Sequence, residues 1–359
     1  MLAKFDTHVH HLMKTPLDES LASFKKVFDA TGVEKMAFMS IPQEKSEGTD
    51  YTQNLKSLFF KDSFSEDGYA FAGLVHNENL SKKEQALDFV RQAQTYAAVG
   101  FDGMKMLEGK PSCRRRFREL LSDPLYDGFF GFLEENGIPV TLHNADPACY
   151  WDKSKMTPYQ LERGWFCGPD LPTKDGMFED VIAVLRRHPR LKLTMAHFGF
   201  LTDNKEQAKL YFDEFENTMV DLTPGGEQFF QMLEDKDFWI DFIERHDTRI
   251  KYGTDTYNNA PMEDEVLWKK RALPRPMLLK NFFETDTEHM YFNEPYRGIA
   301  LSPDRLQKIY MQNALTEYGS PKKIDMEYVR KELKTLETIY ASEADMMYDI
   351  NIMKNFWNA

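Results

Sequence analysis

The stretch FDTHVHH, residues 5–11, is predicted to form a short β-strand that carries two histidines two positions apart. Successive side chains of a strand point to opposite faces, so His8 and His10 share a face while Val9 takes the other. Two imidazoles on one face can bind one divalent cation together. The pair is a modest signal by itself, and its weight depends on further ligands from other strands.

The bulk properties bound the class of protein. The chain has 359 residues, of which 42% are hydrophobic, enough for a large core in one αβ barrel. Its formal net charge of −13 argues against nucleic acid and anionic membranes as partners but leaves an anionic small substrate open, because an acidic protein can contain a basic pocket. Three cysteines suggest no disulfide framework, and no membrane span or signal peptide is evident, so we expect a soluble cytoplasmic protein.

Eight short apolar strands, each followed by a helical pattern, recur about every 30 residues. Strands that alternate with helices in this way form parallel βαβ units, and eight units most naturally close into a TIM (β/α)8 barrel. An open doubly wound sheet is the alternative, but no Gly-x-Gly-x-x-Gly turn follows an early strand. The predicted strands are 5–11, 35–41, 70–76, 101–107, 138–144, 191–199, 218–222 and 249–255.

The chain beyond residue 255 is less regular. Residues 256–300, which contain four prolines, are predicted to form a partly structured excursion over one face of the barrel. A helix is expected over 302–318, and one or two terminal helices over 325–356. We therefore expect one domain, a barrel over residues 1–320 followed by a C-terminal helical extension over 321–359.

Polar residues stand near the carboxyl ends of the predicted strands, where the active site of such a barrel lies. They are His8 and His10 on the first strand, Lys105 on the fourth, His143 on the fifth, His197 on the sixth and Asp255 on the eighth. The chain has nine histidines, so four of them at one predicted mouth form a pattern far more specific than any single member.

Several short motifs carry a family resemblance. In chain order they are DTHVHH, FDGMKM, GIPVTLHN, MAHFG and KYGTD, followed by NALTEYG at 313–319. Together they resemble the amidohydrolase superfamily, in particular the amidohydrolase-2 branch that includes aminocarboxymuconate semialdehyde decarboxylase and related metal-dependent hydrolases. Each motif is short, but their order and spacing are distinctive.

The resemblance implies one divalent metal, zinc above all, with four ligands: His8, His10, His143 and Asp255. It also implies that His197 is the nearby acid or base. Three imidazoles and one carboxylate suit zinc or a similar ion. A bound cation lowers the pKa of its water to about 7, and Asp255 can accept the proton of that water while His197 stabilises an oxyanion.

Lys105 has three interpretations that the sequence leaves open. In other branches of the superfamily a lysine on the fourth strand is carboxylated and bridges two metals, so the resemblance keeps a second metal open here. The side chain is otherwise a buried lysine paired with a carboxylate, or a cation that holds a substrate carboxylate.

Other residues near the mouth have both a structural and a functional interpretation. The arginines of the run 114–118 would mostly form a solvated helix face, yet Arg114 is our candidate among them for holding an anionic substrate. Tyr150 and Trp151 follow the fifth strand and either wall the substrate pocket or pack the loop onto the barrel. His11 shares no face with the paired histidines and is expected to pack or to support them.

The first hypothesis for the function is a metal-dependent hydrolase that acts on an amide, ester or lactone of a small molecule. The alternative is a nonoxidative decarboxylase or a hydratase that acts on a small carboxylic acid, because one fold supports several chemistries. A non-catalytic sugar-binding or scaffold barrel is disfavoured, because every expected ligand residue is present. The oligomeric state cannot be read from the residues, although the resemblance keeps a homodimer open.

Overall fold

The computed structural model describes residues 2–11, 15–43, 48–225, 227–257 and 263–359. Its main sheet has nine parallel strands in the order β8-β7-β6-β5-β4-β3-β2-β1-β9, so from β1 to β8 neighbours in the chain are neighbours in the sheet. The strands are β1 (Lys4–His10), β2 (Val33–Met39), β3 (Gly68–Gly73), β4 (Gly103–Gly109), β5 (Val140–Asn144), β6 (Leu193–Met195), β7 (Thr218–Asp221), β8 (Ile250–Lys251) and β9 (Thr256–Tyr257).

The two ends of this sheet meet in the segment that follows β7. There β8 pairs with β7, whereas β9 pairs with β1. Between the two short strands, the Thr7 amide donates to Tyr252 O over 3.0 Å, and the Asp255 amide donates to His8 O over 2.9 Å. The predicted eighth strand, 249–255, is therefore divided into two pieces, and the sheet forms the predicted TIM-like barrel.

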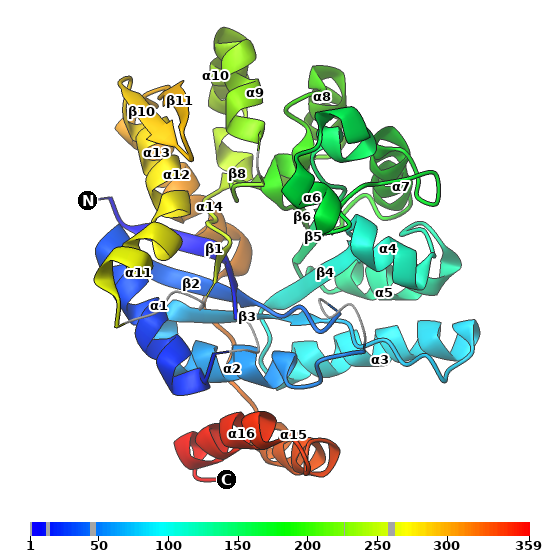
Figure 1. Cartoon of the computed structure of the whole chain (residues 1–359). Helices are drawn as coiled ribbons and strands as arrows, with labels where there is room; N and C mark the ends of the chain where they lie inside the picture. Colours follow the sequence, from blue (N-terminus) through cyan, green and yellow to red (C-terminus); the bar gives the residue numbers. More distant parts are fainter. Residues whose placement is uncertain (1, 12–14, 44–47, 226, 258–262) are drawn as a thin grey trace.

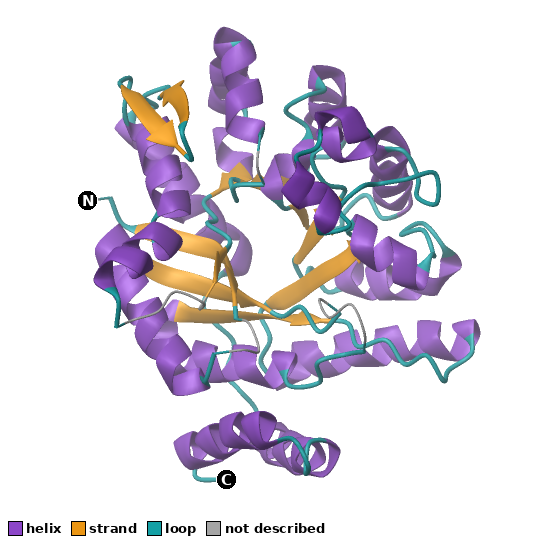
Figure 2. Ribbon diagram, in the orientation of Figure 1, coloured by secondary structure: helices purple, strands orange, loops and turns teal. Residues whose placement is uncertain are grey.

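Helices cover the outside of the barrel (Figures 1 and 2). In α1 the apolar stripe of Phe24, Val27 and Phe28 is buried, and Gly32 ends the helix in the left-handed region. The helices up to the excursion are α1 (Leu17–Thr31), α2 (Gln53–Ser63), α3 (Lys82–Val99), α4 (Pro111–Phe117), α5 (Pro124–Glu135), α6 (Pro158–Glu162), α7 (Lys174–Arg187), α8 (Lys205–Glu214), α9 (Gln228–Glu234) and α10 (Lys236–Arg245).

The predicted excursion after β9 is largely ordered. It contains α11 (Glu265–Ala272), α12 (Pro274–Glu284) and a two-stranded antiparallel hairpin of β10 (Glu288–Tyr291) and β11 (Glu294–Arg297). Its residues 258–262 lie outside the described part of the chain. In Figure 1 the hairpin and α12 lie on the opposite side of the barrel from α4 and α6.

The predicted helix over 302–318 consists of α13 (Pro303–Gln307), a π-helical turn (Lys308–Gln312) and α14 (Asn313–Tyr318). Tyr318 of α14 lies under the barrel, with its ring centroid 5.6 Å from that of Phe5. Phe5 in turn lies 4.8 Å from Tyr69, and all three belong to or pack on one small apolar cluster. This cluster fills the amino-terminal end of the barrel, which leaves the carboxyl ends of the strands for a site.

The C-terminal extension is a pair of helices, α15 (Met326–Ile339) and α16 (Ala344–Trp357), outside the barrel (Figure 1). Asp349 of α16 accepts from Lys56 Nζ over 2.6 Å and from the Leu17 amide over 3.1 Å, and all three residues are buried. These contacts tie α16 to α1 and α2. Among the described residues, no helix is both long enough and apolar enough to cross a membrane.

Candidate active site

The carboxyl end of β1 brings two imidazoles together, as the alternation of strand side chains predicts. His8 Nε2 and His10 Nε2 are 3.0 Å apart, and Asp255 Oδ1 lies 3.5 Å from His10 Nε2. One ligand atom from each of these three buried residues lies within 4.8 Å of the others. We call His8, His10 and Asp255 the ligand group.

The outer nitrogens of both imidazoles are occupied by hydrogen bonds. His8 Nδ1 donates to Asp221 Oδ2 over 2.7 Å, and His10 Nδ1 donates to the Met39 carbonyl over 2.8 Å. Since each Nδ1 carries the proton of the neutral ring, each Nε2 presents a lone pair toward the other and toward Asp255. Two such nitrogens and a carboxylate oxygen fit a divalent cation.

His143 lies outside the ligand group, beside His197. His143 Nδ1 is 3.2 Å from His197 Nε2, and His143 Nε2 is 3.4 Å from Asp146 Oδ1. The His197 amide donates to Asp221 Oδ1 over 2.8 Å, so one carboxylate supports both His8 and His197. The structure thus brings three of the four predicted ligands into one compact group and leaves His143 on the neighbouring side of the same cavity.

Burial controls the charge of these groups. It lowers the pKa of His8, His10, His143 and His197 well below the usual value, so all four rings are neutral near pH 7. Neutral imidazole is the form that binds metal or accepts a proton. Burial raises the pKa of Asp255, and the nearby Arg275 guanidinium opposes this rise.

The backbone is strained where the site residues leave their strands. His197, Phe198 and Asp255 have φ angles of 58°, 53° and 55°, in the left-handed region that side chains other than glycine rarely adopt. At Asp255 this turn interrupts the strand between β8 and β9, while the amide bond to His8 O keeps the residue beside β1. The left-handed turn at Asp255 therefore accompanies the placement of its carboxylate beside His10.

Lys105 of β4 lies beneath the ligand group. Its Nζ is 3.0 Å from His8 Nε2, the same nitrogen that faces the other ligands, and the side chain is buried. The ammonium charge contributes to the low pKa of His8, after burial itself. The role of Lys105 stays a prediction: a carboxylated bridging ligand and a cation that holds a substrate carboxylate both fit a side chain beside the ligand group.

A cavity of about 630 Å³ opens above the ligand group at the carboxyl ends of the strands. His10, His143, His197, Asp255 and the predicted Tyr150 line it. Its wall also contains five cationic side chains: Lys110, Arg115, Arg116, Arg163 and Arg275. Arg275 Nη1 lies 3.1 Å from Asp255 Oδ2, so α12 of the excursion reaches the ligand group.

Two residues that were predicted to contact the substrate, Arg114 and Trp151, lie outside the cavity. Arg114 is buried away from the cavity, where it pairs with Asp180 and donates to Glu119 O over 2.5 Å. Its neighbours Arg115 and Arg116 face the cavity instead. Trp151 does not line the cavity either; its Nε1 donates to Pro172 O over 3.0 Å, which packs the loop onto the structure. The loop-packing interpretation therefore describes Trp151, whereas Arg114 is neither on a solvated helix face nor in the cavity.

Some functional residues were missed from the sequence. Asp221 ends the predicted seventh strand, and the strand-end rule that selected His197 would have selected it too. Arg275 had no comparable signal, because it lies on a helix of the irregular excursion, 20 residues after Asp255. The five cavity cations come from three separate segments, and only folding brings them together.

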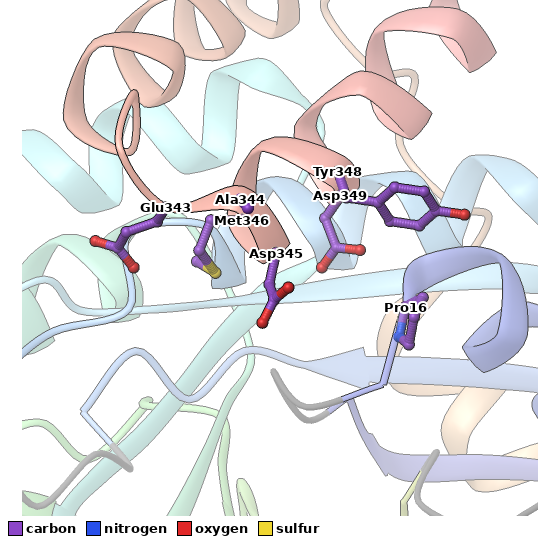
Figure 3. Close-up of a pocket in the computed structure, with 7 residues that line it drawn as sticks. All are labelled: Pro16, Glu343, Ala344, Asp345, Met346, Tyr348 and Asp349. Atoms are coloured by element: carbon purple, nitrogen blue, oxygen red, sulfur yellow. The ribbon is translucent and has the colours of Figure 1, made fainter.

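A second hollow, of about 890 Å³, lies between α16 and Pro16, away from the strand ends (Figure 3). Glu343, Asp345 and Tyr348 point in different directions there rather than toward one point. Asp349 is already paired with Lys56. No histidine, lysine or arginine lines this hollow, so the described residues offer no counterpart of the ligand group there.

Comparisons with known proteins agree with this geometry. A family model described as Amidohydrolase matches residues 60–319, more than half of the chain. No curated protein matches the sequence.

Solved structures share the fold. A 2,6-dihydroxybenzoate decarboxylase complexed with 2,6-dihydroxybenzoate is 16% identical, with a TM-score of 0.51 over 89% of this chain and 99% of the other. A 4-oxalomesaconate hydratase from Rhodopseudomonas palustris is 14% identical, with a TM-score of 0.51 and coverages of 94% and 99%. A putative amidohydrolase from Staphylococcus aureus, 14% identical, has a TM-score of 0.51 and coverages of 89% and 100%. At these identities the likeness concerns the fold.

Proposed function

The chain belongs to the amidohydrolase family, and from that membership we propose that it is a metal-dependent lyase acting on a small carboxylic acid. The reaction is a nonoxidative decarboxylation or the addition of water. Two of the solved structures with this fold are a decarboxylase and a hydratase, which supports a lyase over the hydrolase that we expected first.

The proposed metal is one Zn²⁺, held by His8, His10 and Asp255, with His143 as the predicted fourth ligand. When bound, such an ion supplies a Lewis acid and lowers the pKa of a water molecule. The hydrogen bonds that the two imidazoles donate to Asp221 and to the Met39 carbonyl hold both rings in the ligating tautomer.

His197 and Asp255 are the proposed groups that move protons. The His197 Nδ1 proton is directed at the Thr223 carbonyl, 3.3 Å away, so Nε2 is the nitrogen that accepts or returns a proton in the cavity. Burial raises the pKa of the Asp255 carboxyl, which also fits a group that takes up a proton. Both reactions of the proposal need a proton delivered to or taken from a bound acid.

One observation carries the choice of an anionic substrate. Among the described residues, five cationic side chains and two carboxylates, Asp146 and Asp255, line the cavity of a protein whose formal net charge is −13. A local excess of positive charge around a ligand group attracts and orients an anion. A neutral amide or ester would gain no such attraction from this excess of positive charge.

The proposal is tested with protein that is stripped of metal and then supplied with Zn²⁺. A panel of aromatic and unsaturated carboxylic acids is assayed for release of carbon dioxide and for addition of water. We expect turnover only in the metal-supplied protein. Equal turnover without metal, or none on any acid together with hydrolysis of neutral esters, would overturn the proposal.

Hydrolysis is the second candidate. It is favoured by the raised pKa of Asp255, because burial makes this carboxylate a stronger proton acceptor, which suits the activation of water. The product separates the two candidates, since hydrolysis of an amide, ester or lactone releases an acid and neither carbon dioxide nor a hydrated acid.

The number of metals depends on Lys105. A second metal requires that Lys105 carries an added carboxyl group. Intact-protein mass and metal analysis test this directly, with Lys105→Arg as the variant that cannot be carboxylated. A homodimer and a cytoplasmic location remain parts of the proposal, tested by the molar mass in solution and by cell fractionation.

A further inference from the structure

The cationic residues of the cavity come from two sides of the barrel mouth. Arg275 belongs to α12 of the excursion, whereas Lys110 and Arg115 stand at the start of α4 and along it, and Arg163 directly follows α6. In Figure 1, α12 lies on one side of the barrel, and α4 and α6 lie together on the other. We call Arg275 the inner cation and Lys110, Arg115 and Arg163 the outer cations.

The inner cation is part of the ligand group's surroundings. Arg275 lies 3.1 Å from the Asp255 carboxylate, and its guanidinium carbon lies 5.4 Å from the centroid of the Tyr257 ring. Its place beside a predicted metal ligand means that a substrate carboxylate bound near the metal meets this guanidinium.

One of the outer cations, Arg115, is bonded to the loop after β5. Arg115 donates to Gly164 O over 3.3 Å and also to Phe166 O, so α4 is tied to the residues that follow Arg163. Arg115 Nε also lies 3.0 Å from the exposed Asp170. The loop and α4 therefore form one surface, and the outer cations share it.

Arg163 has no carboxylate partner among the described residues. Its guanidinium rests over the Tyr159 ring, 5.2 Å from the centroid, and the arginine is exposed where it lines the cavity. Cations gathered on one surface repel one another, and an anion bound among them relieves that repulsion. An unpaired guanidinium at a cavity wall is thus available for a carboxylate in bidentate geometry.

Between the two sets of cations the wall is aromatic. Tyr150 and Trp165 stack with their centroids 5.6 Å apart on the outer side, and Tyr257 and Tyr291 lie near Arg275 on the inner side. Such a wall suits a planar, unsaturated carbon skeleton.

We infer that the cavity takes a planar dicarboxylate, one carboxylate bound at the ligand group with Arg275 and the second bound by Arg163 and Lys110. This inference rests on the proposed function and adds to it the second anionic group of the substrate. The outer cations then determine specificity, and the ligand group carries the chemistry.

The test uses Zn²⁺-supplied full-length protein and four probes: isophthalate, terephthalate and the monomethyl ester of each. The esters keep the ring and one carboxylate but lack the second charge. Binding is measured by titration calorimetry. We expect at least one dicarboxylate to bind about tenfold tighter than its own ester, because a charge-assisted contact at the outer cations is gained.

The variant Arg163→Gln/Lys110→Gln locates the effect. We expect it to bring the dicarboxylate down to the affinity of the ester, a loss several times larger than the loss of affinity for the ester itself. The matched control is Arg245→Gln, an exposed arginine on α10 that is paired with Asp241 outside the cavity, and it should change neither affinity.

The outcomes separate this inference from the proposed function. If the esters bind and neither dicarboxylate binds tighter, or if the double variant weakens ester and diacid equally, the second carboxylate site is refuted while a lyase of monocarboxylates stands. If no carboxylate of any kind binds the metal-supplied protein, the inference and the anionic substrate of the proposed function are both overturned.

Discussion

His8 Nδ1 donates to Asp221 Oδ2 over 2.7 Å, and this contact determines which nitrogen of His8 faces His10. The two residues are 213 positions apart in the chain, on the first and seventh strands of the barrel. Asp221 also accepts from the His197 amide, so the same carboxylate fixes a predicted ligand and a predicted acid or base. The end of β7, which carries no predicted metal ligand, thus orients residues on two other strand ends.

Replacement of Asp221 by asparagine should weaken metal binding. The amide has nearly the same shape but lacks the charge that holds the His8 tautomer, so we expect affinity for Zn²⁺ to fall about 10- to 100-fold. Competition with a chelating dye measures it. Asp241→Asn, an exposed carboxylate on α10, is the control, and equal affinities in both variants would show that Asp221 does not support the ligand.

Removal of both β1 imidazoles should abolish metal binding without unfolding the barrel. In His8→Ala/His10→Ala the ligand group keeps only Asp255, and one carboxylate is too few for a stable site. We expect negligible bound metal and no turnover, with a far-ultraviolet circular dichroism spectrum like that of the unmodified protein. A metal content that stays the same would place the metal elsewhere.

Arg114 should matter for stability and not for substrate affinity. Its buried partner Asp180 also accepts from the Leu121 and Ser122 amides, and loss of the arginine leaves that carboxylate without its cation. For Arg114→Met we expect the free energy of unfolding to fall by about 3 kcal/mol in urea. KM of the protein that remains folded should not change.

The exposed Arg245→Met is the control for this measurement, with an expected loss of at most about 1 kcal/mol. A large rise in KM with unaltered stability for Arg114→Met would restore Arg114 as a substrate residue.

His11 should make the protein less stable in acid. Burial lowers the pKa of His11 to about 3, and its Nε2 lies 2.9 Å from Ser57 Oγ. In the unfolded chain His11 takes up a proton near pH 6.5, whereas in the folded protein it stays neutral down to about pH 3. Its contribution to the free energy of unfolding is therefore complete above about pH 6.5 and is lost as the pH falls toward about 3. The slope from this one group is about 1.4 kcal/mol per pH unit.

Urea unfolding of metal-free protein at pH 7 and pH 5.5 measures the effect. His11→Asn removes one titrating group, so the difference in unfolding free energy between the two pH values should shrink relative to the unmodified protein. His246→Asn is a suitable control, because His246 is only partly buried and burial lowers its pKa less completely. An unchanged difference for His11→Asn would mean that the ring is protonated in the fold.

Much of the barrel was readable from the chain. Alternating strands and helices have local periods, and the alternation of side chains on β1 places His8 and His10 on one face whatever surrounds them. The rule that polar strand ends meet at one mouth correctly brought His143, His197 and Asp255 to the same cavity.

The excursion was harder to read. Its helices α11 and α12 lack a strong apolar stripe, and proline begins α12, so the pattern predicted only partial structure. Contacts far apart in sequence decide its form: Arg275 of α12 is held by Asp255, and Ile299 donates its amide to Phe282 O over 2.7 Å. No local signal encodes those partners.

By itself the sequence determined the barrel and the set of groups available for a metal, because strand period and strand-end position are local properties. Only the tertiary structure decided which arginine meets the cavity. Successive residues of a helix point about 100° apart, so Arg114 turns inward to Asp180 while Arg115 and Arg116 face the mouth, and the rotation of α4 is set by its packing. The support of His8 by Asp221 likewise exists only after the sheet has closed.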